Sequence, residues 1–175
     1  MSKKRGTGKV EAGAATPALE ALDKAGVSYE VLEHPHDPRT KQGFALEGAE
    51  LMGLDPDTVY KTLMARVDDS EDVVGIVPAT ATLNLKQLAK AAGGKRAEML
   101  PVARAEVVTG YIAGGISPLG QKQPHRIFLD ESAILQEAIH VSAGKRGWSV
   151  KLEPDTLLAV CKGTYAAIAD FKHHF

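Results

Sequence analysis

The stretch Val59-Tyr60-Lys61-Thr62-Leu63-Met64-Ala65-Arg66-Val67 predicts a β-strand. Successive side chains of a strand point to opposite faces, so Lys61 shares a face with apolar residues only: Val59, Leu63, Ala65 and Val67. An unpaired ammonium is costly to bury. Lys61 therefore either extends its amine to solvent along its apolar stem, or it finds a partner or lines a cavity.

Short elements surround this strand. A second strand is expected at 73–77 after an acidic turn at 68–72, and further strands at 29–32, 126–130, 139–142, 149–152 and 165–170. Short helices are expected at 17–25, 44–52, 85–92, 102–108 and 154–160. Because strands and helices do not alternate regularly, a doubly wound parallel sheet is disfavoured. We predict an α/β (α+β) fold with a curved, mixed sheet and short helices around it.

The chain is expected to form one domain. Residues 1–15 are rich in Lys, Gly and Ala without periodicity, which predicts a disordered arm. Thr16-Pro17 then supplies a helix N-cap followed by proline at the first helical position. We place a single folded domain at 16–172, where no linker or internal repeat interrupts the sequence.

Composition excludes several classes of function. The formal net charge of −1 argues against a generally basic nucleic-acid binder, and no DNA partner is expected. A single cysteine, Cys161, cannot form a disulfide within the chain and suits a reducing compartment. No apolar run approaches the roughly 20 residues that span a bilayer. We therefore expect a cytoplasmic protein without a membrane partner.

Neither a metal nor a cofactor is indicated. The six histidines are scattered and lack the Cys/His spacing of a zinc site. Glycine-rich phosphate loops of the common nucleotide-binding types are missing from the sequence, as is the G-x-S-x-G nucleophile elbow. A metal-dependent or nucleotide-dependent enzyme is the least supported alternative.

The segment Gly114-Gly115-Ile116-Ser117-Pro118-Leu119-Gly120 is expected to form an irregular loop. Glycines let a ligand approach bare N–H groups, and such groups stabilise negative charge that develops on a carbonyl oxygen. The alternative is a tight turn with a purely structural role.

A second turn, Val141-Ser142-Ala143-Gly144-Lys145-Arg146-Gly147, brings a hydroxyl close to two adjacent cations. Lysine and arginine side chains bind phosphate, so this turn is a candidate phosphate contact. The alternative is an ordinary solvated turn.

Taken in order, these segments resemble a known family. Thr16-Pro17-Ala18, Tyr60-Lys61-Thr62-Leu63, the glycine loop continued by Gln121-Lys122, and the Val141–Gly147 turn are similar to motifs of the YbaK-type Cys-tRNA(Pro) deacylases. That family is related to the editing domain inserted in bacterial prolyl-tRNA synthetases. The resemblance spans residues 16–170 and implies a barrel-like mixed sheet with a pocket for the aminoacylated 3′ end of a tRNA.

The resemblance also implies roles for individual residues. Lys61 would hold the terminal adenosine or its phosphates, Gly115 and its neighbours would contact the aminoacyl carbonyl, and Ser142 would position the amino acid or the ribose. Further substrate contacts are expected from eight residues: His34, Thr62, Gly114, Ile116, Ser117, Pro118, Lys145 and Arg146. For a cysteinyl ester, the substrate's own thiol would attack the carbonyl.

The implied activity is hydrolysis of mischarged tRNA in trans, with Cys-tRNA(Pro) the expected substrate and prolyl-tRNA synthetase a further partner. His34 stands where the family often has tyrosine, and Ser149 stands where an acidic residue is common. A preference for another small residue such as alanine therefore stays open. A non-catalytic module that binds tRNA or a synthetase is the second alternative.

Overall fold

The computed structural model describes residues 4–5, 16–34 and 44–171 of the 175-residue chain. Its helices are α1 (Pro17–Ala25), α2 (Phe44–Met52), α3 (Leu85–Ala91), α4 (Val102–Thr109) and α5 (Pro154–Cys161), with 3-10 turns η1 (Pro56–Thr58) and η2 (Glu131–Leu135). The longer strands are β2 (Glu30–Glu33), β3 (Tyr60–Val67), β4 (Glu71–Pro78), β7 (Arg126–Asp130), β8 (Ile139–Lys145) and β9 (Trp148–Leu152). The shorter strands are β1 (Lys4–Arg5), β5 (Ala81–Leu83), β6 (Ala97–Met99), β10 (Thr164–Ala166) and β11 (Ala169–Phe171).

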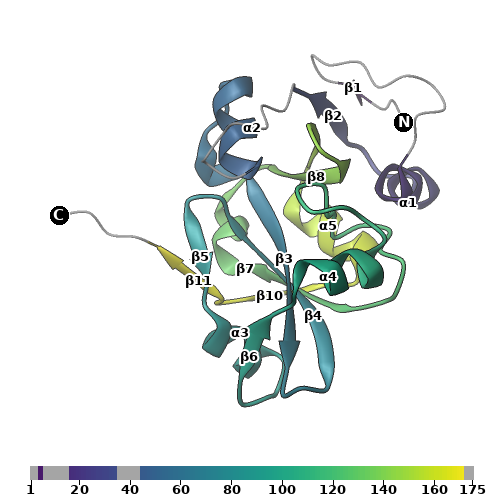
Figure 1. Cartoon of the computed structure of the whole chain (residues 1–175). Helices are drawn as coiled ribbons and strands as arrows, with labels where there is room; N and C mark the ends of the chain where they lie inside the picture. Colours follow the sequence, from purple (N-terminus) through teal and green to yellow (C-terminus); the bar gives the residue numbers. More distant parts are fainter. Residues whose placement is uncertain (1–3, 6–15, 35–43, 172–175) are drawn as a thin grey trace.

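The described strands form three sheets, of which the two larger ones mix parallel and antiparallel pairs and the third is a single antiparallel pair. Their orders are β1-β2-β9-β8, β10-β7-β4-β3-β6 and β11-β5. The predicted mixed α/β fold is confirmed, but these sheets do not close into a barrel. A single parallel bridge between Val59 and His140 joins the start of β3 to β8 in the neighbouring sheet. Figure 1 shows α2 and β8 at one end of the molecule and α3 and β6 at the other.

The sequence explains why β3 and β4 are central. On β4, Val74 and Ile76 pack into the larger apolar cluster, while Val73 and Val77 pack into a second cluster that contains Leu88 of α3. All four valine and isoleucine side chains are fully buried. A strand that is apolar on both faces is typical of a sheet covered on both sides.

The expected helix at 17–25 is confirmed with its caps. The Thr16 hydroxyl accepts a hydrogen bond from the Leu19 backbone at 3.2 Å, and Gly26 ends the helix in the left-handed conformation at φ 70°. The same hydroxyl donates to the carbonyl of Ala143 at 2.5 Å. This contact fixes the start of α1 against β8 next to Ser142.

The C-terminal prediction was wrong in detail. A single strand was expected at 165–170, but β10 and β11 belong to different sheets. The Asp130 carboxylate accepts hydrogen bonds from the backbone of Ile168 and Ala169, both at 3.0 Å, and so fixes the break between the strands. Within the predicted arm at 1–15, Lys4–Arg5 pair in parallel with β2, and the other residues of the arm lie outside the described part of the chain.

Candidate active site

A cavity of about 410 Å³ opens where β3, β8 and β9, α2, α4 and the glycine loop meet. This volume is in the usual range for a small-molecule site. Six of the predicted site residues line it: His34, Lys61, Thr62, Gly114, Ile116 and Ser142. Five others do not: Gly115, Ser117, Pro118, Lys145 and Arg146.

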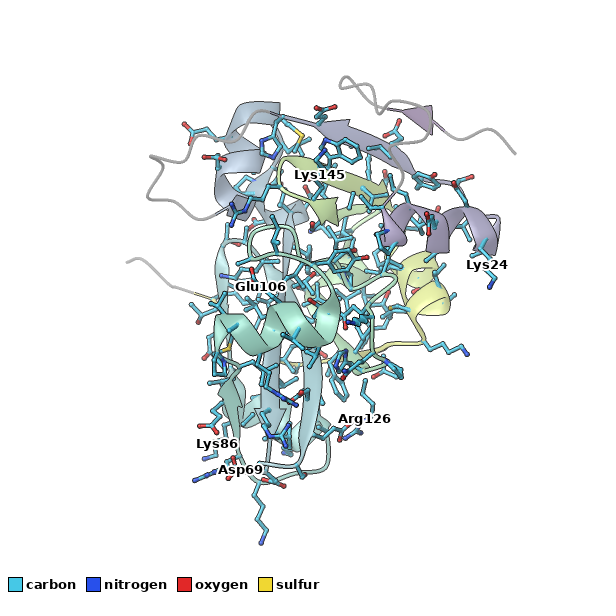
Figure 2. The ribbon with its side chains drawn as sticks, turned by 45° about the vertical axis from the view of Figure 1, so that its right-hand side comes forward. Lys24, Asp69, Lys86, Glu106, Arg126 and Lys145 are labelled. Carbon is cyan, nitrogen blue, oxygen red and sulfur yellow. The ribbon has the colours of Figure 1, made fainter. Side chains whose placement is uncertain are left out.

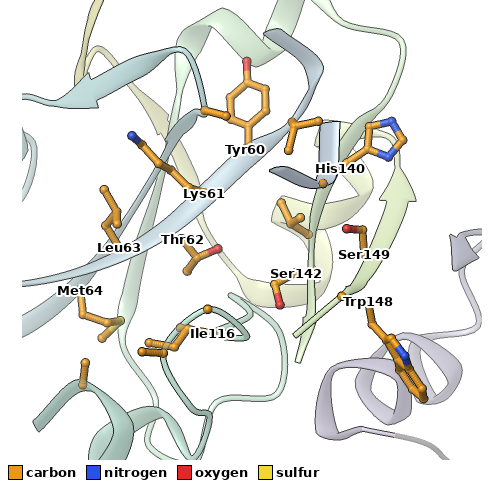
Figure 3. A pocket seen from close by; sticks show the side chains of 18 of the residues that line it. Tyr60, Lys61, Thr62, Leu63, Met64, Ile116, His140, Ser142, Trp148 and Ser149 are labelled. Atoms are coloured by element: carbon orange, nitrogen blue, oxygen red, sulfur yellow. The ribbon is translucent and has the colours of Figure 1, made fainter. Parts of the chain in front are cut away.

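Strand β3 presents Lys61 and Thr62 to different sides. The face that carries Lys61 is apolar as predicted, since Leu63 and Ala65 belong to the cluster under α3. Figure 3 shows the Lys61 side chain leaving the strand on the same side as Leu63, opposite Thr62. Lys61 is half-buried and lines the cavity, so its amine can reach the edge of the cavity. Its side chain does not lie on the same face of β3 as that of Thr62.

The Thr62 hydroxyl is a buried polar atom in this cavity. Its Oγ1 has no hydrogen-bond partner among the residues that the structure describes. Figure 3 shows Thr62 on the side of β3 that faces Ile116 and Ser142. A buried hydroxyl without a partner is destabilising, so its presence points to a ligand that completes the hydrogen bond.

The glycine loop is held from both sides at Ala113. The Ala113 N–H donates to the Glu106 carboxylate at 2.8 Å, and its carbonyl accepts from Arg146 Nε at 2.7 Å. Gly114 follows at φ 88°, a conformation that favours glycine. The loop that borders the cavity is therefore fixed by α4 and by the β8–β9 turn.

The N–H of Gly115 is already used, because it donates to the carbonyl of Ile112 at 2.9 Å. Of the backbone contacts predicted for Gly115 and its neighbours, those of the neighbours stay candidates. Within the described chain, the N–H groups of Gly114 and Ile116 make no internal hydrogen bond, and both residues line the cavity.

Ser117 and Pro118 were predicted to contact substrate, and the structure places them inside the loop instead. Both residues are buried, and the Ser117 hydroxyl accepts from the Leu119 backbone at 3.2 Å. The Ser117 carbonyl accepts from Gln121 at 3.0 Å. Their role is to shape the loop.

Ser142 and Ser149 face each other across β8 and β9 and both line the cavity. The Ser142 hydroxyl accepts a hydrogen bond from the Gly144 backbone at 3.1 Å. Neither this hydroxyl nor that of Thr62 is bonded to a histidine in the described residues. The two groups can position a substrate, but they do not form a nucleophile–base pair.

The two cations of the turn lie outside the cavity. The Lys145 amine stands 4.6 Å from the centre of the Trp148 ring, and Arg146 is directed to Ala113. Figure 2 shows Lys145 at the end of the molecule opposite Asp69 and Lys86. Phosphate contact by Lys145 and Arg146 stays a prediction.

His34 enters the cavity from the end of β2. Its backbone N–H donates to the carbonyl of Gly147 at 2.8 Å, so β2 continues its pairing to the turn. The ring of His34 is close enough to Gly48 of α2 that a Cβ there would approach Nε2 to 2.8 Å. The following Pro35-His36-Asp37-Pro38, part of the predicted polar loop, lies outside the described residues.

Sequence reasoning missed His140, which it treated as one of six scattered histidines. His140 lines the cavity with only 4% of its surface exposed. Burial, followed by the charge of Lys151, lowers the pKa of its imidazole to about 4. Alternation along β8 was the available signal, since it places His140 on the same face as Ser142.

The apolar walls were missed as well. Met64 of β3, Leu100 before α4 and Ala105 of α4 line the cavity together with Ile116. They come from elements that only the tertiary fold brings together, and the sequence carried no motif for them.

Neither a metal site nor a membrane-spanning helix is found in residues 4–5, 16–34 and 44–171. No three His, Cys, Asp or Glu side chains there lie close enough together to hold a metal ion. None of the helices in that part of the chain is both long and apolar enough to cross a membrane.

Comparison with known proteins agrees with this geometry. Residues 44–160 match the sequence profile of the family described as aminoacyl-tRNA editing domain. The chain is 42% identical over 120 residues to EbsC of Enterococcus faecalis, a protein assigned as a Cys-tRNA(Pro)/Cys-tRNA(Cys) deacylase, and the match covers 69% of this chain and 73% of EbsC.

The fold has counterparts among solved structures. A protein described as a trans-editing enzyme for prolyl tRNA synthetase superposes with a TM-score of 0.77 over 88% of this chain and 95% of its own, at 22% identity. Identity at that level shows a shared fold. With the profile match and the similarity to EbsC, the chain belongs to the aminoacyl-tRNA editing domain family.

Proposed function

We propose that this chain hydrolyses the ester between a mischarged amino acid and its tRNA, with Cys-tRNA(Pro) the expected substrate. The observation that carries the proposal is the unpartnered Thr62 hydroxyl, in a cavity that is also lined by Gly114 and Ile116. Such a site offers hydrogen bonds to an ester and apolar space for a small side chain. The family and the similarity to EbsC support the choice of substrate.

Gly114 and Ile116 would act on the ester carbonyl. Their N–H groups are free of internal bonds in the described chain and belong to a loop fixed by Glu106 and Arg146. Preorganised N–H donors stabilise the negative charge that develops on the oxygen in the transition state. Removing one such donor typically costs roughly 100- to 1,000-fold in rate.

The nucleophile would come from the substrate. For a cysteinyl ester, the thiol sulfur forms a bond to the carbonyl carbon, the bond from that carbon to the ribose oxygen breaks, and the thiol proton ends on the departing ribose hydroxyl. The cyclic thioester released in this step is then opened by water to free cysteine, which completes the hydrolysis. This assignment fits Ser142 and Thr62, whose hydroxyls have no histidine base within hydrogen-bond distance in the described residues. The protein would then act through positioning and electrostatic stabilisation.

Lys61 would act at the edge of the cavity. Because its side chain leaves β3 opposite Thr62, its amine suits a phosphate or the terminal adenosine rather than the carbonyl. We also propose that the chain works in the cytoplasm and in trans to prolyl-tRNA synthetase.

A pair of lysine variants tests the proposal. Lys61→Ala should slow deacylation of Cys-tRNA(Pro) by at least about tenfold, chiefly through KM, since one charge-assisted contact is worth roughly 1.5–3 kcal/mol. Lys24→Ala, at an exposed position of α1, removes an equal charge away from the cavity and should leave the rate unchanged (Figure 2). Equal effects of the two substitutions would contradict a role for Lys61, and a wild-type rate no faster than in buffer would refute deacylation of this ester.

A further inference from the structure

His140 occupies a defined place in the cavity. It precedes Ser142 by two residues on β8, so both side chains lie on one face of the strand. Its backbone forms the parallel bridge with Val59 that joins the two sheets. The residue is 96% buried, since only 4% of its surface is exposed, yet it lines the cavity.

The imidazole ring of His140 has an unused hydrogen-bonding atom in the described structure. Its Nδ1 is buried and has no hydrogen-bond partner among the described residues, the same condition as Thr62 Oγ1. Buried polar atoms are almost always hydrogen-bonded, and an exception that lines a cavity is available to bind a ligand atom. The two atoms come from different strands, so the cavity holds two separate points of polar recognition.

The imidazole is uncharged near neutral pH. Burial and the neighbouring charge of Lys151 lower its pKa to about 4, while Glu30 opposes this effect. A neutral imidazole carries one donor and one acceptor nitrogen. It therefore suits an uncharged polar partner better than a phosphate.

His140 lies at the opposite end of the cavity from the apolar residues that would contact the amino-acid side chain. Figure 3 shows it at one end of the labelled residues, with Met64 and Ile116 at the other and Thr62 and Ser142 between them. Its bridge partner Val59 packs with Ala49 and Ala79, and the Ala79 N–H donates to the Val59 carbonyl at 2.7 Å. This end of the cavity combines apolar walls with the polar side chains of His140 and the neighbouring Ser149.

A nucleobase has the matching shape and chemistry, with apolar faces and a polar edge of donors and acceptors. We infer that His140 binds the adenine base of the terminal adenosine of the tRNA through Nδ1, and so selects the nucleotide to which the amino acid is attached. The inference rests on the proposed function, because an aminoacyl ester bound at Thr62 and the glycine loop leaves its adenosine to the other end of the cavity. His140 is thus a specificity-determining residue for the deacylation reaction.

The test compares two substrates with three proteins. Cys-tRNA(Pro) is prepared with its normal terminal adenosine or with purine riboside, which lacks the exocyclic amine. The wild type should show kcat/KM about tenfold higher for adenosine, as expected for one hydrogen bond. His140→Leu should cleave both substrates equally, and His140→Asn, which keeps a polar atom near the position of Nδ1, should recover part of the preference.

A stability measurement separates this role from a structural one. Replacing a buried polar group that lacks a partner with an apolar group should leave the urea midpoint of His140→Leu unchanged or higher. Undiminished preference for adenosine in His140→Leu would overturn the inference. It would also be overturned if the wild type had no preference while His140→Leu slowed both substrates equally, since the ring would then contact another part of the substrate.

A second readout does not depend on catalysis. In ¹⁵N spectra of the histidine rings, adenosine should shift the Nδ1 resonance of His140, and purine riboside should shift it less. His125 is the internal control, because its Nδ1 already contacts Gln121 at 2.7 Å. If the wild type has no deacylase activity, the proposed function is refuted, but adenosine binding to His140 can still be measured. A His140 resonance that adenosine does not move would contradict the inference whatever the activity.

Discussion

Gly115 lies against the backbone of Arg146, so closely that a Cβ at position 115 would stand 3.0 Å from the Arg146 amide nitrogen. The carbonyl carbon of Lys145 would be at the same distance. Both obstacles are backbone atoms of the β8–β9 turn, which cannot rotate away as a side chain can. The glycine is needed here because the loop and the turn pack closely against each other. The hydrogen bond from Arg146 to the Ala113 carbonyl then fixes the N–H donors of Gly114 and Ile116 at the cavity.

Gly115→Ala should therefore push the loop away from the turn. We expect a loss of about 1–3 kcal/mol in the free energy of unfolding and a fall in kcat for Cys-tRNA(Pro) of at least about tenfold. Gly93→Ala is the control, because Gly93 has φ 81° with nothing within 4 Å of its added Cβ. It should lose roughly 1 kcal/mol of stability with unchanged kcat, as measured by urea unfolding and single-turnover deacylation. Unaltered kcat in Gly115→Ala would show that the loop does not position the donors.

Thr62→Val separates stability from activity. The Thr62 hydroxyl is buried without a partner in the described structure, so an apolar side chain of nearly equal shape should be neutral or slightly stabilising. The same substitution removes a hydrogen bond to the substrate and should lower kcat/KM by about tenfold. Thr62→Ser should retain most of the activity, and Thr82→Val, at an exposed position of β5, serves as the control. A destabilised but fully active Thr62→Val would assign the hydroxyl to the fold.

The pKa of His140 predicts an acid-sensitive fold. Its value of about 4 in the folded protein lies below the 6.5 of an ordinary histidine, chiefly because burial disfavours the charged ring. The unfolded chain thus binds the proton more readily, and stability present above pH 6.5 is lost as the pH falls toward 4. The loss should reach about 2 kcal/mol at pH 5.

Urea unfolding at pH 7 and pH 5 checks this expectation, with wild type beside His140→Leu. The difference in stability between the two proteins should change in favour of the variant by about 2 kcal/mol over this interval. Parallel losses in both proteins would mean that other groups cause the acid sensitivity.

A feature of this site could be predicted from the sequence where it depends on residues that are close together in the chain. Lys61 was a candidate because alternation along one strand is local, and the glycine loop because its composition excludes regular structure, whereas Thr62 was a candidate only through the resemblance of Tyr60–Leu63 to a family motif. The sequence also placed the helix caps at Thr16 and Gly26, which depend on neighbouring residues only. Such features need no tertiary information.

The missed features are those that the tertiary fold creates. β5 and β6 have only three residues each, too few for alternation to be visible. Ser117 was assigned to substrate binding from the family resemblance, but the loop turns its hydroxyl toward the Leu119 backbone. His140 became notable only when the cavity showed that its Nδ1 is buried without a partner in the described residues.

The proposed use of the substrate's thiol predicts a specific chemical dependence. Cys-tRNA(Pro) should be cleaved at least about 100-fold faster than the same tRNA carrying S-methylcysteine, because the methyl group removes the nucleophile. Loading both esters in single-turnover reactions at equal enzyme excess separates chemistry from binding. Equal rates would indicate that water is the nucleophile and that preference follows side-chain size.

The central claim is that this chain is a deacylase for mischarged tRNA. Its most direct test is the first-order rate of ester loss from Cys-tRNA(Pro), Ala-tRNA(Pro) and Pro-tRNA(Pro), with purified wild-type protein and with buffer alone. We predict rapid loss of the cysteinyl ester, slower loss of the alanyl ester and no acceleration for the prolyl ester. Rates equal to those in buffer for all three, with the tRNA still bound, would contradict the claim and favour a non-catalytic tRNA-binding module.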